Sequence, residues 1–280
     1  MVISVHKTKW MLFGPFPCVL PSITVNDAAI QLVEDYKYVG IRFVSTHRCI
    51  FAKHYKVKAS KARDVANATF TVEGLIGSLP PADACILYMA RVDPHLTFGA
   101  EVTLDVDETL LDTLADIQHA FIRRMLGLSD HLMLVVLFIE TGLMPLQYRH
   151  IILALSYLQH LLSLPASHYA HMALRDSLAF ATAHKPCWVS DLHIVLHRLP
   201  HFPVDLPCSL SNMEADNVAM TIRDVEISCM RSCLKFINDS DKTIFLHQRW
   251  ICDRKTGTPQ LSSVLALQDY LTQVPVPRFR

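Results

Sequence analysis

The stretch 36-YKYVGIRFVSTHRCIFAKHYKVKASKARDVANATF-70 decides the fold, because the chain changes there from a strand pattern to a helix pattern. In residues 36–44, apolar side chains alternate with other side chains. This period of two predicts a single strand with Val39, Ile41 and Phe43 on one face. After residue 46 the apolar spacing becomes three and four, the period of an amphipathic helix that ends near Gly74 or Gly77. The apolar stripe of this helix contains Phe51, Tyr55, Ala59, Ala62, Ala66 and Thr69.

The segments on either side predict strands before this stretch and helices after it. Residues 8–13 form a short apolar run, and Asn26-Asp27 is a turn signal that predicts a hairpin. Pro80-Pro81 marks the start of a helix. Further helices are predicted at 107–127, 147–163, 167–183, 187–198 and 214–237. We expect an α+β fold that is mostly α, with a small antiparallel N-terminal sheet followed by a multi-helix bundle.

Composition favours an intracellular protein, in the nucleus or cytoplasm, that is not secreted. The eight cysteines are scattered without a Cys-x-x-Cys pair, which is typical of reduced thiols. The longest uncharged apolar run, residues 132–139, is much shorter than the about twenty residues of a membrane span. Lys7 and Lys9 interrupt the apolar N-terminus, which argues against a secretory signal.

The net charge is zero, so attraction to nucleic acid must come from a local patch. One basic segment, residues 36–63, contains no aspartate or glutamate. Lys53, Lys56, Lys61 and Arg63 fall away from the apolar stripe, and an outward basic helix face can bind phosphates without reading sequence. The predicted nucleic-acid-binding residues are Lys37, Arg42, Arg48, Lys53, Lys56, Lys58, Lys61 and Arg63. The alternative is a solvated helix face without a partner.

Patterns for metal binding and catalysis are weak. Cys229-x3-Cys233 and His247-x4-Cys252 resemble a zinc knuckle only superficially, because the middle spacing is too long. The pairs His168/His171 and His193/His197 lack a neighbouring glutamate, and Asp105-x-Asp107 is interpreted as a helix cap. The sequence contains no P-loop, GxSxG or GxGxxG motif. We therefore expect no catalytic residue, no metal and no cofactor.

Six segments in order resemble the C-terminal part of non-LTR (LINE-type) retrotransposon reverse transcriptases, in the form common in fungal genomes. They are KTKWMLFGP at 7–15, YKYVGIRF at 36–43, HYKVKASKA at 54–62, LTFGAEV at 96–102, IQHAFIRRMLGL at 117–128 and ETGLMPLQYRHIILALSYL at 140–158. The resemblance implies a palm-end β remnant at 1–45, a thumb-like helical domain at 46–200, and a linker plus helical segment at 201–280. It also implies a β-hairpin near the primer terminus at 36–43, with Tyr36, Tyr38 and Gly40 as primer-grip-like residues.

The sequence departs from this family at the catalytic centre. Such polymerases hold two metal ions with an aspartate pair that should lie just before residue 7, and the sequence contains no Asp-Asp dipeptide. We therefore expect a non-catalytic remnant that binds an RNA or DNA backbone and is not an enzyme. The alternatives are a helical protein-interaction module that self-associates or binds a protein through residues 8–44, and a truncated gene model without a retained function.

Overall fold

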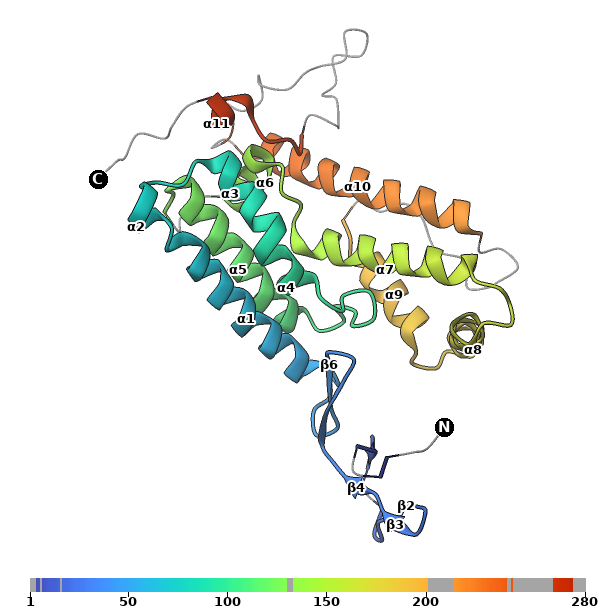
Figure 1. The fold of residues 1–280 in the computed structure, drawn as a ribbon. Coiled ribbons are helices and arrows are strands. Elements are labelled where there is room, and N and C mark those ends of the chain that lie inside the picture. The colour runs from blue at the N-terminus through green and yellow to red at the C-terminus, as the bar shows by residue number, and fades with distance from the viewer. Residues whose placement is uncertain are drawn as a thin grey trace.

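The computed structural model describes residues 4–5, 7–15, 17–129, 133–200, 214–240, 243 and 264–273. Helices dominate these residues, and the strands all precede the first helix, which confirms the mostly helical α+β class. The helices pack into one body, and the N-terminal strands project from it beyond the first turn of α1 (Figure 1). No helix in the described ranges combines the length and the apolar character needed to cross a membrane.

The strands form three separate pairs and not the one antiparallel sheet that we expected. β2 and β3 are an antiparallel hairpin whose turn residues Asn26 and Asp27 have φ of 49° and 60°, which confirms the predicted turn. β1 runs parallel to β4, so the run at residues 8–13 contributes only two paired residues. The strand bounds are Lys9–Trp10 (β1), Thr24–Val25 (β2), Ala28–Ala29 (β3) and Gln31–Leu32 (β4).

Residues 36–44 form a hairpin, so the prediction of one strand from periodicity was wrong. β5 (Asp35–Tyr38) pairs antiparallel with β6 (Ile41–Val44). Val39 and Gly40 make the two-residue turn, with φ of 48° and 92°. The alternation of apolar side chains does not reveal this turn, because it has the same period of two in both strands of the hairpin. Val39 is 78% exposed at the tip, so it does not share a buried face with its neighbours in β6.

The helix that follows this hairpin confirms its predicted stripe. α1 (Ala52–Phe70) buries Tyr55, Ala59, Ala62, Ala66 and Thr69. Its small alanines allow α5 (Glu108–Leu126) to pack closely along it. α5 begins and ends as predicted, since the carboxylate of Asp107 accepts a hydrogen bond from the Thr109 N–H and Gly127 adopts φ of 66°. The short α2 (Glu73–Ile76) ends at Gly77.

The helix predicted from Pro80-Pro81 consists of three consecutive segments. α3 (Pro81–Leu87) continues through a π-helical turn, η1 (Tyr88–Val92), into α4 (Asp93–Thr97). Together with α1 and α5 these segments enclose a first apolar core. Its centre is Phe121, whose ring centroid lies 4.7 Å from that of Phe70 and 5.2 Å from that of Tyr88.

A second apolar core lies between α7 and α10, which pack along each other (Figure 1). The helices predicted here are confirmed as α7 (Leu146–Ser163), α8 (Tyr169–Thr182), α9 (Trp188–His197) and α10 (Ala215–Asn238). The sequence analysis missed α6 (Leu134–Thr141) and α11 (Asp269–Gln273). Most of the linker expected at 200–212 and much of the tail at 252–280 lie outside the described residues.

Candidate nucleic-acid interface

Four of the eight predicted basic residues meet at a cavity of about 380 Å³ where the β5–β6 hairpin faces α1 and α4. The hairpin contributes Lys37, Gly40 and Arg42, while α1 and the α4 segment contribute the other lining residues. These are His54, Val57, Lys58, Lys61, Pro94, His95 and Phe98. Among the described residues, four that line this hollow carry lysine or arginine charges and none is acidic, so we name it the basic cavity.

The hairpin places two positive side chains side by side. Lys37 and Arg42 are direct cross-strand partners, and like charges at such positions repel. Asp35 relieves part of this repulsion, because its carboxylate lies 3.1 Å from Arg42 Nη1 and also pairs with Lys53. The hydrogen bond from Lys53 is the largest of the effects that lower the pKa of Asp35. Two of the predicted nucleic-acid-binding residues, Arg42 and Lys53, are therefore partly neutralised within the protein.

α1 forms the floor of the basic cavity. Lys61 is exposed, but Lys58 is only 4% exposed, and its ammonium has no hydrogen-bond partner among the described residues. Lys58 therefore does not belong to the exposed basic face of α1, and its contact with nucleic acid stays a prediction. Lys58 follows Tyr55 by three residues, so its stem runs back along the buried side of the helix, and its Nζ lies 5.2 Å from the Tyr55 ring centroid.

A buried polar network supports this floor. The Tyr55 hydroxyl donates to Asp105 Oδ1 at 2.6 Å, and Asp105 Oδ2 lies 2.8 Å from His150 Nδ1. His150 Nε2 lies 3.0 Å from the Leu96 carbonyl oxygen, so both ring nitrogens face acceptors. Burial is the largest single effect and would raise the pKa of Asp105. The charge and hydrogen bond of His150, the hydrogen bond from Tyr55 and the charge of Lys58 together outweigh burial and lower that pKa. Asp105 is thus a buried structural carboxylate, and Asp107 alone provides the helix cap that was predicted for the Asp105-x-Asp107 pair.

The end of α4 closes the remaining side of the cavity. A β-carbon at Gly40 would lie 2.6 Å from the Phe98 ring, and the residue has φ of 92°, so only glycine fits the hairpin tip there. His54 Nε2 lies 3.3 Å from the Phe98 carbonyl oxygen. Burial, followed by the charge of Lys58, lowers the pKa of His54 to about 4, so the ring is neutral near pH 7.

The other residues predicted to bind nucleic acid do not line the basic cavity. Lys56 and Arg63 are exposed on α1 but do not line it, and Arg48 lines a different hollow with Asp107 and Asp191. Tyr36 donates to the Lys7 carbonyl oxygen at 3.3 Å, whereas Tyr38 is 63% exposed. The lining residues Val57, Pro94, His95 and Phe98 and the counter-ion Asp35 were not predicted from the sequence. Only Asp35 had a sequence signal, because it directly precedes the acid-free segment.

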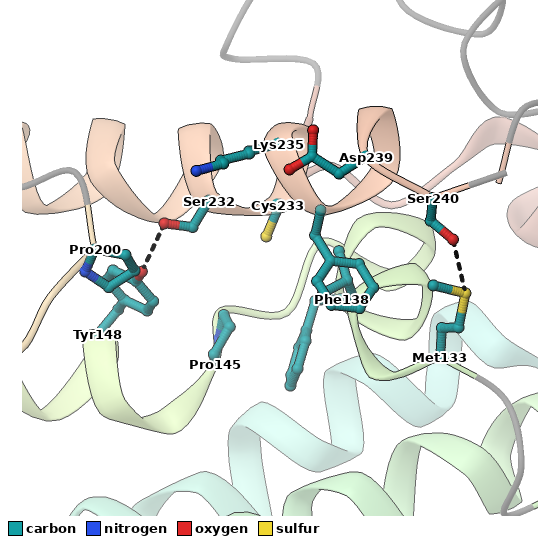
Figure 2. A pocket seen from close by; sticks show the side chains of 12 residues that line it. Met133, Phe138, Pro145, Tyr148, Pro200, Ser232, Cys233, Lys235, Asp239 and Ser240 are labelled. Atoms are coloured by element: carbon teal, nitrogen blue, oxygen red, sulfur yellow. Dashed lines mark hydrogen bonds between the residues drawn. The ribbon is translucent and has the colours of Figure 1, made fainter. Parts of the chain in front are cut away.

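A second, apolar cavity of about 750 Å³ lies between α6, α7 and α10 (Figure 2). Phe138 and Cys233 line it, and the Tyr148 hydroxyl donates to Ser232 Oγ at 3.1 Å. Met133 and Ser240, which also line it, directly adjoin segments outside the described residues, so we assign this cavity no ligand.

The candidate metal residues are used structurally where the structure describes them. Cys229 and Cys233 are buried on α10, whereas His247 and Cys252 lie outside the described residues. His168 caps α8 by accepting a hydrogen bond from the Ala170 N–H, and the described ranges contain no group of three or more metal-ligating side chains.

Fold and site together define a mostly helical protein with a basic cavity beside a β-hairpin. No family model, curated protein or solved structure matches the chain.

Proposed function

We propose that the chain binds the backbone of RNA or DNA, without reading sequence and without polymerase chemistry, through the basic cavity and the exposed face of α1. In this proposal the chain is a non-catalytic remnant of a LINE-type reverse transcriptase, and α1 keeps the role of a thumb helix. The resemblance of residues 36–43 and 54–62 to that family supports the proposal, because these segments form a hairpin and a basic helix that face one cavity.

One observation supports binding above all others. Lys37, Lys56, Lys61 and Arg63 are exposed, and none of them forms an ion pair within the described part of the chain. Lys37 and Lys61 line the basic cavity, whereas Lys56 and Arg63 lie on the exposed face of α1 outside it. Together the four cations attract a polyanion and release its counterions. Lys53 and Arg42 contribute less, because Asp35 already compensates them.

A quadruple variant should lose most of its affinity for a duplex, and the remaining affinity should depend less on salt. It replaces Lys37, Lys56, Lys61 and Arg63 with alanine. Each lost phosphate contact reduces the slope of log affinity against log salt by about 0.9, so the quadruple variant should lose about 3 to 4 in slope. Fluorescence anisotropy with two unrelated duplex sequences at several salt concentrations measures both effects.

The matched control replaces four exposed cations far from the cavity, Arg175, Lys185, Arg223 and Arg231, with alanine. It removes the same charge and should keep the affinity within about twofold, because rim charges matter mainly where they touch the ligand. Equal losses in the two variants would contradict a localised interface. Wild-type protein without salt-dependent binding would contradict the proposed function.

A second candidate function is self-association through residues 8–44, which the projecting strands favour. Each strand pair has only two strands, so every strand in this region keeps an unpaired edge. The side chains of Phe13, Val19 and Val39 are 50%, 82% and 78% exposed. An apolar surface beside open strand edges favours pairing with a second copy of the chain.

Aspartate at Phe13, Val19 and Val39 should shift the full chain toward monomer, because charges at an apolar contact oppose association. Sedimentation velocity at several protein concentrations measures this shift. The control places aspartate at Leu75, Tyr169 and Met220, which are also exposed but lie on the helical body. A wild-type chain that is monomeric at all concentrations would refute this second function.

A further inference from the structure

We propose that the basic cavity binds the terminal nucleotide of a nucleic-acid strand by its phosphomonoester group, with Lys58 as the buried counter-ion. This inference rests on the proposed function and deepens it, since it names which part of the strand enters the cavity. A phosphodiester inside a strand continues on both sides, whereas a strand end has only one connection and can enter a hollow with its terminal group.

The charges at the cavity favour an anion with more than one negative charge. Lys37 and Lys61 are exposed at the cavity, and Arg42 is only partly compensated by Asp35. A phosphomonoester carries between one and two negative charges near pH 7, more than the single charge of a diester. Arginine and lysine donors form their strongest hydrogen bonds with such oxygens.

Lys58 is the second and independent observation. A buried ammonium without a hydrogen-bond partner is costly, so its presence needs an explanation. Burial lowers the pKa of Lys58 to about 8, while Asp105 and Glu101 act in the opposite direction. The ammonium therefore remains mostly charged at pH 7, although neither carboxylate hydrogen-bonds to it within the described residues. A phosphate in the cavity would supply the missing negative charge.

The size and the apolar wall of the cavity fit a nucleotide better than a phosphate alone. Its volume of about 380 Å³ is within the usual range of small-molecule sites. Phe98 is 49% exposed and lines the cavity together with Pro94. An aromatic ring beside a phosphate site can stack on a base or pack against a sugar without selecting a sequence.

The test compares strands that differ only at their ends. Oligonucleotides with a 5′-phosphate, a 3′-phosphate or two hydroxyl ends are measured by anisotropy, and adenosine 5′-monophosphate is compared with adenosine by calorimetry. At least one phosphorylated strand should bind about tenfold more tightly than the hydroxyl strand, as one charged hydrogen bond predicts. The monophosphate should likewise bind more tightly than adenosine.

Lys58→Met should abolish this preference and leave the salt-dependent binding of the hydroxyl strand in place. Because methionine removes an unpartnered buried charge, the variant without ligand should melt at a higher temperature than wild type. A lower melting temperature would show that Lys58 is a structural cation and would overturn the inference. Lys61→Gln should weaken the preference without touching the core, whereas Lys53→Gln should not, because Lys53 does not line the cavity.

The outcomes separate the inference from the proposed function. Salt-dependent binding of every strand with no preference for a phosphate end overturns only the inference. Tight binding of the monophosphate without binding of duplex supports the site and contradicts the proposed function. A preference that persists unchanged in Lys58→Met and Lys61→Gln places phosphate recognition elsewhere and overturns the inference.

Discussion

Replacing Asp105 with alanine should lower the free energy of unfolding by about 3–5 kcal/mol, the usual cost of breaking a buried charge pair. The variant leaves the His150 ring and the Tyr55 hydroxyl without their shared acceptor inside the protein. Urea denaturation at pH 7 measures the loss. Asp107→Ala is the matched control, because it removes only an exposed helix cap and should cost about 1 kcal/mol. Equal losses would show that the Asp105 network contributes little.

The same carboxylate predicts how stability depends on acid. The pKa of Asp105 in the folded protein lies below its ordinary value, so the unfolded chain takes up the proton first as the pH falls. Its contribution to stability is therefore complete above the ordinary aspartate pKa and disappears as the pH falls through the lower, folded value. Asp105→Asn should be less stable than wild type at pH 7, and the difference should narrow below about pH 4.

Replacing Phe121 with alanine should lower the free energy of unfolding by about 3–5 kcal/mol, because the side chain is buried between two other rings. Phe70 belongs to α1, so the cavity left by Phe121 should also loosen the helix that carries the basic face. Thermal denaturation measures the loss, and hydrogen exchange along α1 measures the loosening. Phe180→Ala is the control, since that ring is 49% exposed and should matter far less. A small loss at Phe121 would mean that the core collapses around the cavity.

Helix positions could be predicted from the sequence because their signals are local. Pro81 and Gly127 mark helix ends by their backbone conformation, and Asp107 does so with its side-chain carboxylate. The stripe from Tyr55 to Thr69 is buried as its spacing predicts. α6 was missed because its first six residues are all apolar, so no period distinguishes a buried helix from a strand.

The basic cavity could be predicted only in part, because it depends on contacts between distant segments. Lys37 and Lys61 were found from charge alone. The burial of Lys58 depends on its direction along α1, and the role of Phe98 depends on the approach of α4 to Gly40. Asp35 was overlooked because the acid-free segment begins at residue 36, whereas the fold places Asp35 opposite Arg42 and Lys53. The count of basic residues in the sequence therefore overestimated the positive charge that is not compensated by a nearby carboxylate in the fold.

The π-helical turn at Tyr88–Val92 has a consequence for how this chain would align with relatives. Ala84, Tyr88, Val92 and Leu96 are all fully buried at steps of four residues. In a regular helix that spacing drifts by about 40° per step, which would rotate Leu96 off the core face. The π-helical turn has more residues per turn, so it compensates for this rotation. Pro94, His95 and Phe98 therefore still face the cavity. A relative with a regular helix here would therefore need one residue fewer, and its gap would fall inside the helix and not in a loop.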